Sequence, residues 1–172
     1  MNEAMKNLMT RRSCRSYLPK QVEEEVLQQI LQAGLYAPSA RNWQSSVMVV
    51  CRDPEEIALM SRLNAAAMGV DSDPFYGAPC VVVVLGDTEY PCWLQDGSLV
   101  MGNLMNAAHA CGVASCWINR AMEVFDSEEG KALLRKWGVP EHFRGVGNCI
   151  LGYAAAEPGA PAPRKENRIL MR

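Results

Sequence analysis

Val81-Val82-Val83-Val84-Leu85 is the stretch that decides the fold of this chain of 172 residues. β-Branched side chains favour strands, and a strand that is apolar at every position has both of its faces buried. The segments before and after this run have the apolar spacing of helices rather than of further strands. A central sheet covered by helices on both faces satisfies this pattern.

The other expected elements follow from apolar spacing and from capping residues. Asp53-Pro54-Glu55-Glu56 combines an N-cap aspartate, a first-turn proline and a glutamate three residues after the cap, so it opens a helix. Ser127 is expected to cap a later helix. The expected strands are residues 47–51, 81–85, 114–118 and 144–153, and the expected helices are 3–9, 22–35, 54–68, 94–111 and 128–137. From Ala154 onward the tail is rich in Ala, Pro and Gly, which favours an extended path.

The helix at residues 94–111 is apolar around most of its circumference, from Leu99 to Cys111. We therefore expect it to be buried nearly all round. In a chain of this size, such burial indicates a subunit interface. The extended tail is also expected to cross onto a partner subunit, because it cannot close on its own core.

Composition and charge exclude several classes of function. The hydrophobic content of 49% and charged content of 21% are those of an ordinary globular chain, here expected to be one domain of residues 1–172. A formal net charge of −2 predicts no broad attraction to nucleic acid or to an anionic membrane. No segment has the length of a membrane span or the apolar core of a signal peptide, so the cytoplasm is the expected compartment.

The seven cysteines and two histidines do not have metal-site spacing, and no metal is expected. Cys51, Cys80, Cys116 and Cys149 lie in apolar runs and are interpreted as reduced core thiols. Cys14 stands among arginines, which would lower the pKa of its thiol and make it reactive, although a bystander role in the loop is the simpler interpretation.

Two basic clusters lie near opposite ends of this mildly acidic chain: Arg11-Arg12-Ser13-Cys14-Arg15 and Pro161-Ala162-Pro163-Arg164-Lys165. Guanidinium groups bind oxyanions through paired hydrogen bonds, and a serine hydroxyl adds a neutral donor. A ligand that carries a phosphate would account for both clusters. Solvated surface charge is the alternative for either cluster taken alone.

Five segments, in this order, resemble motifs of the FMN-dependent nitroreductase family in its short form. They are residues 11–17 (RRSCRSY), 37–44 (APSARNWQ), 75–79 (FYGAP), 112–118 (GVASCWI), and 151–153 (LGY) with 163–165 (PRK). The resemblance implies an α+β fold, a three-layer α/β/α sandwich with a central mixed sheet and a C-terminal tail that extends onto the partner subunit. It also implies a homodimer with FMN sites at its interface.

The resemblance assigns the phosphate end of FMN to the two basic clusters. It implies that Arg11, Arg12 and Ser13 contact the phosphate and the ribityl chain. Arg164, or its neighbour Lys165, would complete the phosphate clamp.

The flavin ring is assigned to other residues. Arg15 matches the position of a cation that faces the N1–C2 carbonyl edge of the ring. A backbone N–H at Asn119 or Arg120 would bond flavin N5, although the family usually has small residues there, often glycine. The residues expected to reach the flavin from the partner subunit are Pro38, Ser39, Ala40 and Asn42.

The implied activity is that of an FMN-dependent NAD(P)H oxidoreductase. Hydride would pass through flavin N5 to a nitroaromatic, quinone or related small acceptor by a ping-pong mechanism, so no side chain is assigned as a catalytic acid or base. His109 is expected to be a satisfied core histidine, and His142 to lie at the surface. The alternatives are other chemistry on the same flavin fold (ene reduction, dehydrogenation or dehalogenation) and an FMN-binding protein that is not an enzyme.

Overall fold

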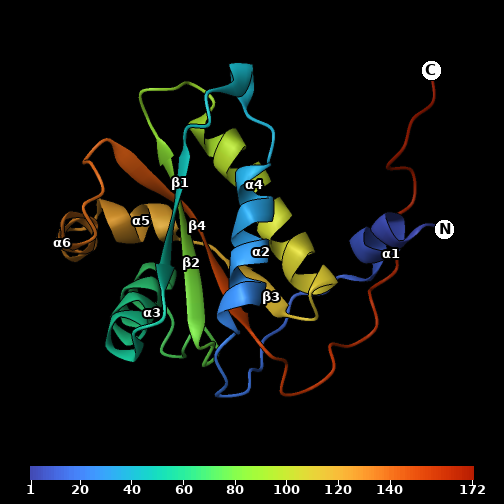
Figure 1. Ribbon diagram of the computed structural model, residues 1–172, viewed down its shortest axis with the longest axis horizontal. Helices are drawn as coiled ribbons and strands as arrows, with labels where there is room; N and C mark the ends of the chain where they lie inside the picture. Colours follow the sequence, from blue (N-terminus) through green and yellow to red (C-terminus); the bar gives the residue numbers. More distant parts are fainter.

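A four-stranded sheet forms the middle layer of the computed structural model, which describes residues 1–172 (Figure 1). Its strands are β1 (Ser46–Cys51), β2 (Cys80–Asp87), β3 (Ala114–Ile118) and β4 (Phe143–Gly152), in the order β1-β2-β4-β3. All neighbouring strands pair antiparallel. The sheet was expected to be mixed, with parallel and antiparallel pairs. The parallel pairing is limited to an isolated bridge between Ser13 and Ser115, outside the named strands.

Helices cover both faces of this sheet, as predicted. α2 (Glu24–Leu35) and α4 (Trp93–Ala110) lie on one face, whereas α3 (Pro54–Met68), α5 (Ala121–Asp126) and α6 (Glu128–Lys136) lie on the other (Figure 1). Alternate residues of β2 supply the two cores. Val81, Val83 and Leu85 join the core under α3, α5 and α6. Val82 and Val84 join the core under α2 and α4, so the strand is buried on both faces.

The capping residues act as the sequence predicts. The Asp53 carboxylate accepts hydrogen bonds from the N–H groups of Glu55 and Glu56 at 2.9 and 3.0 Å and begins α3. The Ser127 hydroxyl accepts from Gly130 N–H at 3.1 Å and begins α6. Every predicted strand and helix is present, with ends that differ by a few residues.

Two short elements were not predicted: α5 and the 3₁₀ turn η1 (Ala40–Asn42). α5 has six residues and no side-chain cap at its start. A helix of fewer than two turns shows too few apolar positions for its period to be recognised.

Within one chain, α4 is buried only in part, and the predicted burial nearly all round would need a partner subunit. Val100, Met101, Leu104 and Ala108 are buried on the side that faces the sheet. Leu99, on another side, is 47% exposed. The reason is that the sheet covers only one side of the helix, so burial of the remainder would need a second molecule.

Residues 11–18 form an extended segment along the edge of the sheet, between α1 (Glu3–Thr10) and α2. The Cys14 N–H donates to Ser115 O at 3.0 Å, beside the start of β3. The Leu18 N–H donates to Tyr153 O at 2.8 Å, just after the end of β4. These backbone contacts fix where the arginines of the segment emerge.

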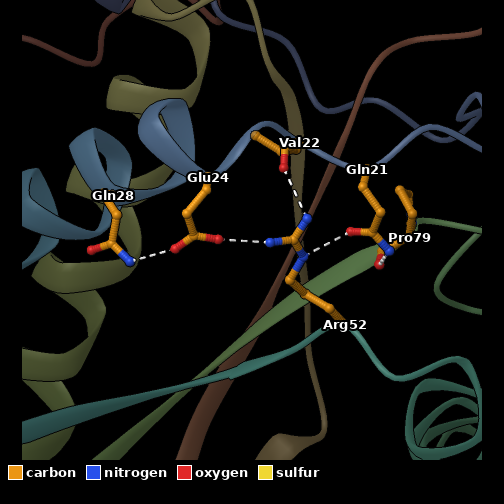
Figure 2. A network of polar contacts seen from close by, with 6 residues as sticks. All are labelled: Gln21, Val22, Glu24, Gln28, Arg52 and Pro79. Carbon is orange, nitrogen blue, oxygen red and sulfur yellow. Dashed lines mark hydrogen bonds and ion pairs between the residues drawn. The ribbon is translucent and has the colours of Figure 1, made fainter.

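Arg52, just after β1, fastens the segment that leads into α2 (Figure 2). Its guanidinium donates to Gln21 Oε1 at 3.1 Å, to Val22 O at 3.1 Å and to Glu24 Oε2 at 2.8 Å. Gln21 in turn donates to Pro79 O at 2.8 Å. One arginine therefore ties the start of α2 to β1 and, through Gln21, to the segment before β2.

The thiols are free and mostly buried. Cys51, Cys80, Cys116 and Cys149 lie in the core, as predicted. Burial raises the pKa of Cys51 to about 12 and that of Cys80 to about 11. Cys14 is only 4% exposed, and its Sγ donates to Ser16 O at 3.1 Å. Such burial favours the bystander interpretation of Cys14 over a reactive thiol.

From Ala154 onward the chain is exposed and forms no helix or strand; it runs past α1 (Figure 1). Among the helices, none combines the length and the apolar character that a membrane crossing requires.

Candidate functional site

A cavity of about 240 Å³ lies where the arginine segment passes the start of β3. Arg11, Arg12 and Cys14 line it from the segment, and His109 lines it from the last turn of α4. Glu157, an exposed tail residue, supplies the only carboxylate of the lining. Two guanidinium groups against one carboxylate make this a cavity suited to an anion.

Arg11 carries the clearest sign of a missing partner. The residue is half-buried, and its Nη1 nitrogen is shut off from solvent without a hydrogen-bond acceptor. The other two side-chain atoms in this condition, Ser46 Oγ and Asn148 Oδ1, are uncharged. A buried donor on a charged group costs free energy when it is left unpaired, so an anionic ligand would relieve a cost that the protein alone bears.

The other arginines of the segment are used differently. Arg12 Nη1 donates to Met9 O at 2.9 Å and to Arg11 O at 2.6 Å. Part of this guanidinium is therefore used to bond backbone carbonyls at the end of α1. Arg15 is exposed. Ser13 is half-buried, and its backbone forms the bridge to Ser115. The structure therefore gathers Arg11 and Arg12 at one cavity, whereas Arg15 faces solvent.

The loop between α2 and β1 is the most strained part of the backbone. Arg41, Asn42 and Gln44 all have positive φ angles, of 49°, 57° and 50°. Left-handed conformations are unfavourable for residues other than glycine and persist where the surrounding structure enforces them, often at functional sites. Pro38, Ser39, Ala40 and Asn42, which the sequence assigned to the site, all belong to this loop.

Asp96 holds this loop, and sequence reasoning missed it. Its carboxylate is 4% exposed, and it accepts hydrogen bonds from Ala40 N–H at 3.0 Å and from the Ser45 hydroxyl at 3.1 Å. Asp96 lies in the first turn of α4, where the helix dipole favours a negative charge. The signal available in the sequence was a single carboxylate near the start of a helix that has no other acidic residue.

The loop and the arginine segment lie at opposite ends of α4. Asp96, which holds the loop, is in the first turn of the helix, and His109, beside the arginines, is in the last. At about 1.5 Å per residue, these positions are about 20 Å apart along the axis. Within one chain, the structure therefore does not bring Pro38–Asn42 together with Arg11 and Arg12.

Asn119 and Arg120 occupy a third place, after the end of β3 and before α5. Arg120 has a φ of 76°, the left-handed conformation that glycine adopts without strain. Its guanidinium pairs with Glu123 on α5 at 2.7 Å, and this hydrogen bond lowers the pKa of the Glu123 carboxyl. The side chain is therefore held over α5.

The second basic cluster is not brought to the cavity. Arg164 and Lys165 are exposed, and Arg164 Nη2 donates to Ala162 O within the tail itself at 2.9 Å. The tail residues that line the cavity are instead Ala154, Glu157 and Pro158.

The two histidines also differ in their surroundings. His142 has a side chain that is 39% exposed, as expected. His109 is not in the core, contrary to expectation. It is half-buried, and its Nε2 lies 2.9 Å from Thr10 Oγ1 of α1. The reason is that the last turn of α4 extends past the sheet core to meet α1.

Comparison with known proteins gives one consistent result. The family model described as Nitroreductase family matches residues 8–70 and 56–153. A protein of Archaeoglobus fulgidus, provisionally named NADH dehydrogenase/NAD(P)H nitroreductase, is 33% identical over 158 residues, which are 91% of this chain and 88% of that protein. The NADH dehydrogenase of Thermus thermophilus is 40% identical over an alignment that covers 91% and 88% of the two chains.

Solved structures agree with the sequence matches. A nitroreductase with bound FMN from Bacteroides fragilis superposes with a TM-score of 0.91 at 28% identity, covering 99% of each chain. A nitroreductase with bound FMN from Desulfitobacterium hafniense gives a TM-score of 0.89 at 27% identity and covers all of both chains.

Proposed function

Because this chain belongs to the nitroreductase family, we propose that it binds FMN and acts as an FMN-dependent NAD(P)H oxidoreductase. Two structural relatives whose full length it matches are nitroreductases with bound FMN. The observation that carries the proposal in this chain is the buried Nη1 of Arg11, which has no acceptor and belongs to a residue that lines a cavity. The FMN phosphate is an acceptor of the right charge for it. Residues 1–172 would act as one domain.

The donors around the cavity fit a phosphate group. The Nη1 of Arg11 is already shut off from water, so its attraction to an anion is screened less than at the surface. Arg12 keeps donors that its two backbone acceptors do not use. Ser13, which forms a backbone bridge with Ser115 of the lining, would add a hydroxyl. Arg164 and Lys165 would have to move from their exposed positions to complete the clamp.

The distance between the two halves of the site favours a homodimer. The strained loop and the arginine segment lie at opposite ends of α4 in one chain. If two copies of α4 packed antiparallel about a two-fold axis, the loop of one subunit would approach the arginines of the other. The outer side of α4, where Leu99 is 47% exposed, is available for this packing.

When bound, FMN would supply a ring nitrogen, N5, that takes a hydride from NAD(P)H and passes it to a small acceptor such as a nitroaromatic or a quinone. The chain would contribute position and charge. Arg15 would place a positive charge near the N1–C2 edge of the ring, and a backbone N–H at Asn119 or Arg120 would orient it. NAD(P)H and the electron acceptor would bind to the same site one after the other. The protein would act in the cytoplasm.

The test begins with protein purified without added cofactor. Its visible absorption spectrum is recorded before and after addition of NADH or NADPH under anaerobic conditions. We expect a flavin spectrum that bleaches, followed by recovery on addition of a nitroaromatic or a quinone. A flavin spectrum that persists with both donors would contradict the oxidoreductase proposal and favour a non-enzymatic FMN protein. Absence of flavin, with no binding of added FMN, would contradict the whole proposal.

A further inference from the structure

We propose that His109 is a third cationic ligand for the FMN phosphate and that binding of the phosphate is coupled to protonation of its imidazole. This inference rests on the proposed function, because it concerns the same cavity. His109 lines that cavity together with Arg11 and Arg12. It comes from the last turn of α4, an element outside the five sequence motifs.

The hydrogen bonds of the Thr10 hydroxyl determine which nitrogen of His109 carries a proton. The Thr10 hydroxyl donates to Lys6 O at 2.7 Å, and the same oxygen lies 2.9 Å from His109 Nε2. A hydroxyl has one proton, and the contact to Lys6 uses it. His109 Nε2 must therefore be the donor in the second contact. Nδ1 is the nitrogen left to gain a proton and to donate to a ligand.

Charges of both signs surround His109. From the segment, Arg11, Arg12 and Cys14 line the same cavity, and the two guanidiniums bring positive charge to it. From the tail, Glu157 faces it with a negative charge. A bound phosphate would add nearly two negative charges and reverse this balance. Imidazole changes its charge near neutral pH, so it is suited to respond to that reversal.

The groups on the α1 side and the helix itself complete the environment. Glu3 and Lys6 of α1 line the neighbouring groove that His109 also borders, and their charges are opposite. His109 lies in the last turn of α4, where the helix dipole favours a cation. When the phosphate arrives, His109 is therefore the group proposed to change its charge.

The experiment measures binding to the flavin-free full-length protein. Dissociation constants of FMN and of riboflavin, which lacks the phosphate, are determined by fluorescence quenching between pH 7.0 and 8.5. FMN keeps its phosphate mostly as the dianion in this range, because the second proton of a phosphate monoester leaves near pH 6. We expect FMN to bind about threefold to tenfold more weakly at pH 8.5 than at pH 7.0, within the limit of tenfold per pH unit for one linked proton. Riboflavin binding should not change.

The matched variant is His109→Gln. The Gln amide can still donate to Thr10 Oγ1, but it cannot gain a charge. We expect the variant to keep the thermal stability of the flavin-free protein and to lose the pH dependence of FMN binding. Calorimetry in buffers of different ionisation enthalpy should detect proton uptake when FMN binds to the wild-type protein and none in the variant.

Two results would overturn the inference, and they differ from failure of the proposed function. A wild-type protein that binds FMN equally well across the pH range would exclude His109 as a coupled ligand. A pH dependence that survives in His109→Gln would assign the effect to another group. A wild-type protein that binds no FMN at any pH would instead refute the proposed function and this inference with it.

Discussion

Among single residues, Arg11 shows that a side chain can lower the stability of the fold and still favour ligand binding. Its Nη1 is buried without an acceptor, a condition that lowers the stability of the free protein. Residues that are costly to the fold and useful to a ligand are common at functional sites. Arg12 Nη1 has two acceptors within the chain, so it does not carry the free-energy cost of an unpaired donor.

Arg11→Ala tests whether Arg11 lowers the stability of the free protein and contributes to ligand binding. We expect FMN binding to weaken by about 1.5–3 kcal/mol, the contribution of a hydrogen bond to a charged group, while the free energy of unfolding of the flavin-free protein stays the same or rises. Flavin fluorescence titration and urea unfolding measure the two quantities. Arg135→Ala, at an exposed position of α6, is the control and should change neither. Unchanged affinity in Arg11→Ala would remove Arg11 from the phosphate site.

At the scale of elements, the η1 loop depends on α4. Three residues at positive φ lie within four positions, and the nearby Asp96 carboxylate accepts from Ala40 N–H and from the Ser45 hydroxyl. The Ser39 hydroxyl accepts from Gln44 N–H at 3.0 Å and closes the loop on itself. Asp96 is therefore a positioning residue: it keeps the loop in a shape that its own backbone preferences oppose.

Asp96→Ala should remove that support. We expect a loss of about 1–3 kcal/mol in unfolding free energy, because Ala40 N–H and Ser45 Oγ lose a buried acceptor. FMN affinity should fall as well, since the loop contains Pro38–Asn42. Asp96→Asn still offers an oxygen to Ala40 N–H and should restore most of both properties. If FMN affinity is unaffected in Asp96→Ala while stability falls, the loop is not part of the flavin site.

A second pair of elements is joined by Glu23, at the start of α2, and Tyr153, just after β4. Hydrogen bonds from Lys20 first, and then from Tyr153, lower the pKa of the Glu23 carboxyl from 4.5 to about 2. A carboxyl whose pKa is lowered in the folded state stabilises the protein above pH 4.5, and this stabilisation is lost as pH falls towards 2.

Glu23→Gln should therefore reduce the dependence of unfolding free energy on pH between pH 4.5 and 2. Because Glu23 is exposed to solvent, the change is expected to be small at neutral pH. Urea unfolding over a series of acidic buffers measures it. Glu25→Gln, at an exposed position of the same helix, is the comparison and should retain the wild-type pH profile. Identical profiles for the two variants would show that Glu23 has no special role.

At the scale of the whole molecule, the proposal requires two chains. The arginine cavity and the strained loop are separated by nearly the full length of α4, and the outer side of this helix exposes Leu99. A site built from two subunits can be tested by complementation. A variant with a defect in one half of the site still supplies an intact other half to its partner.

Mixing two variants that each bind FMN weakly provides this test. Arg11→Ala would damage one half of the site, and the double variant Ser39→Ala/Asn42→Ala would damage the other. After subunit exchange, about half of the dimers are mixed, and each contains one intact site, so about a quarter of all sites should bind FMN with wild-type affinity. Native mass spectrometry of differently tagged subunits verifies exchange. Mixed dimers that bind no more FMN than either parent would contradict a shared site.

Much of this architecture follows from local sequence patterns. Apolar residues at every position of residues 81–85 require a strand that is buried on both faces, and Asp53 and Ser127 mark helix starts by offering oxygen to unpaired N–H groups. The motifs also named the arginine segment and the loop at residues 38–42. The strand and the helix starts were predictable because each depends on residues a few positions apart.

The tertiary structure alone decided the rest. The antiparallel order β1-β2-β4-β3 joins strands far apart in the chain. Asp96 meets Ala40 across 56 positions, and His109 meets Thr10 across 99. Burial is also a tertiary property, which is why His109 proved to border a cavity and the outer side of α4 proved to be open. Spacing in the sequence determines which face a side chain takes, whereas only packing determines what that face meets.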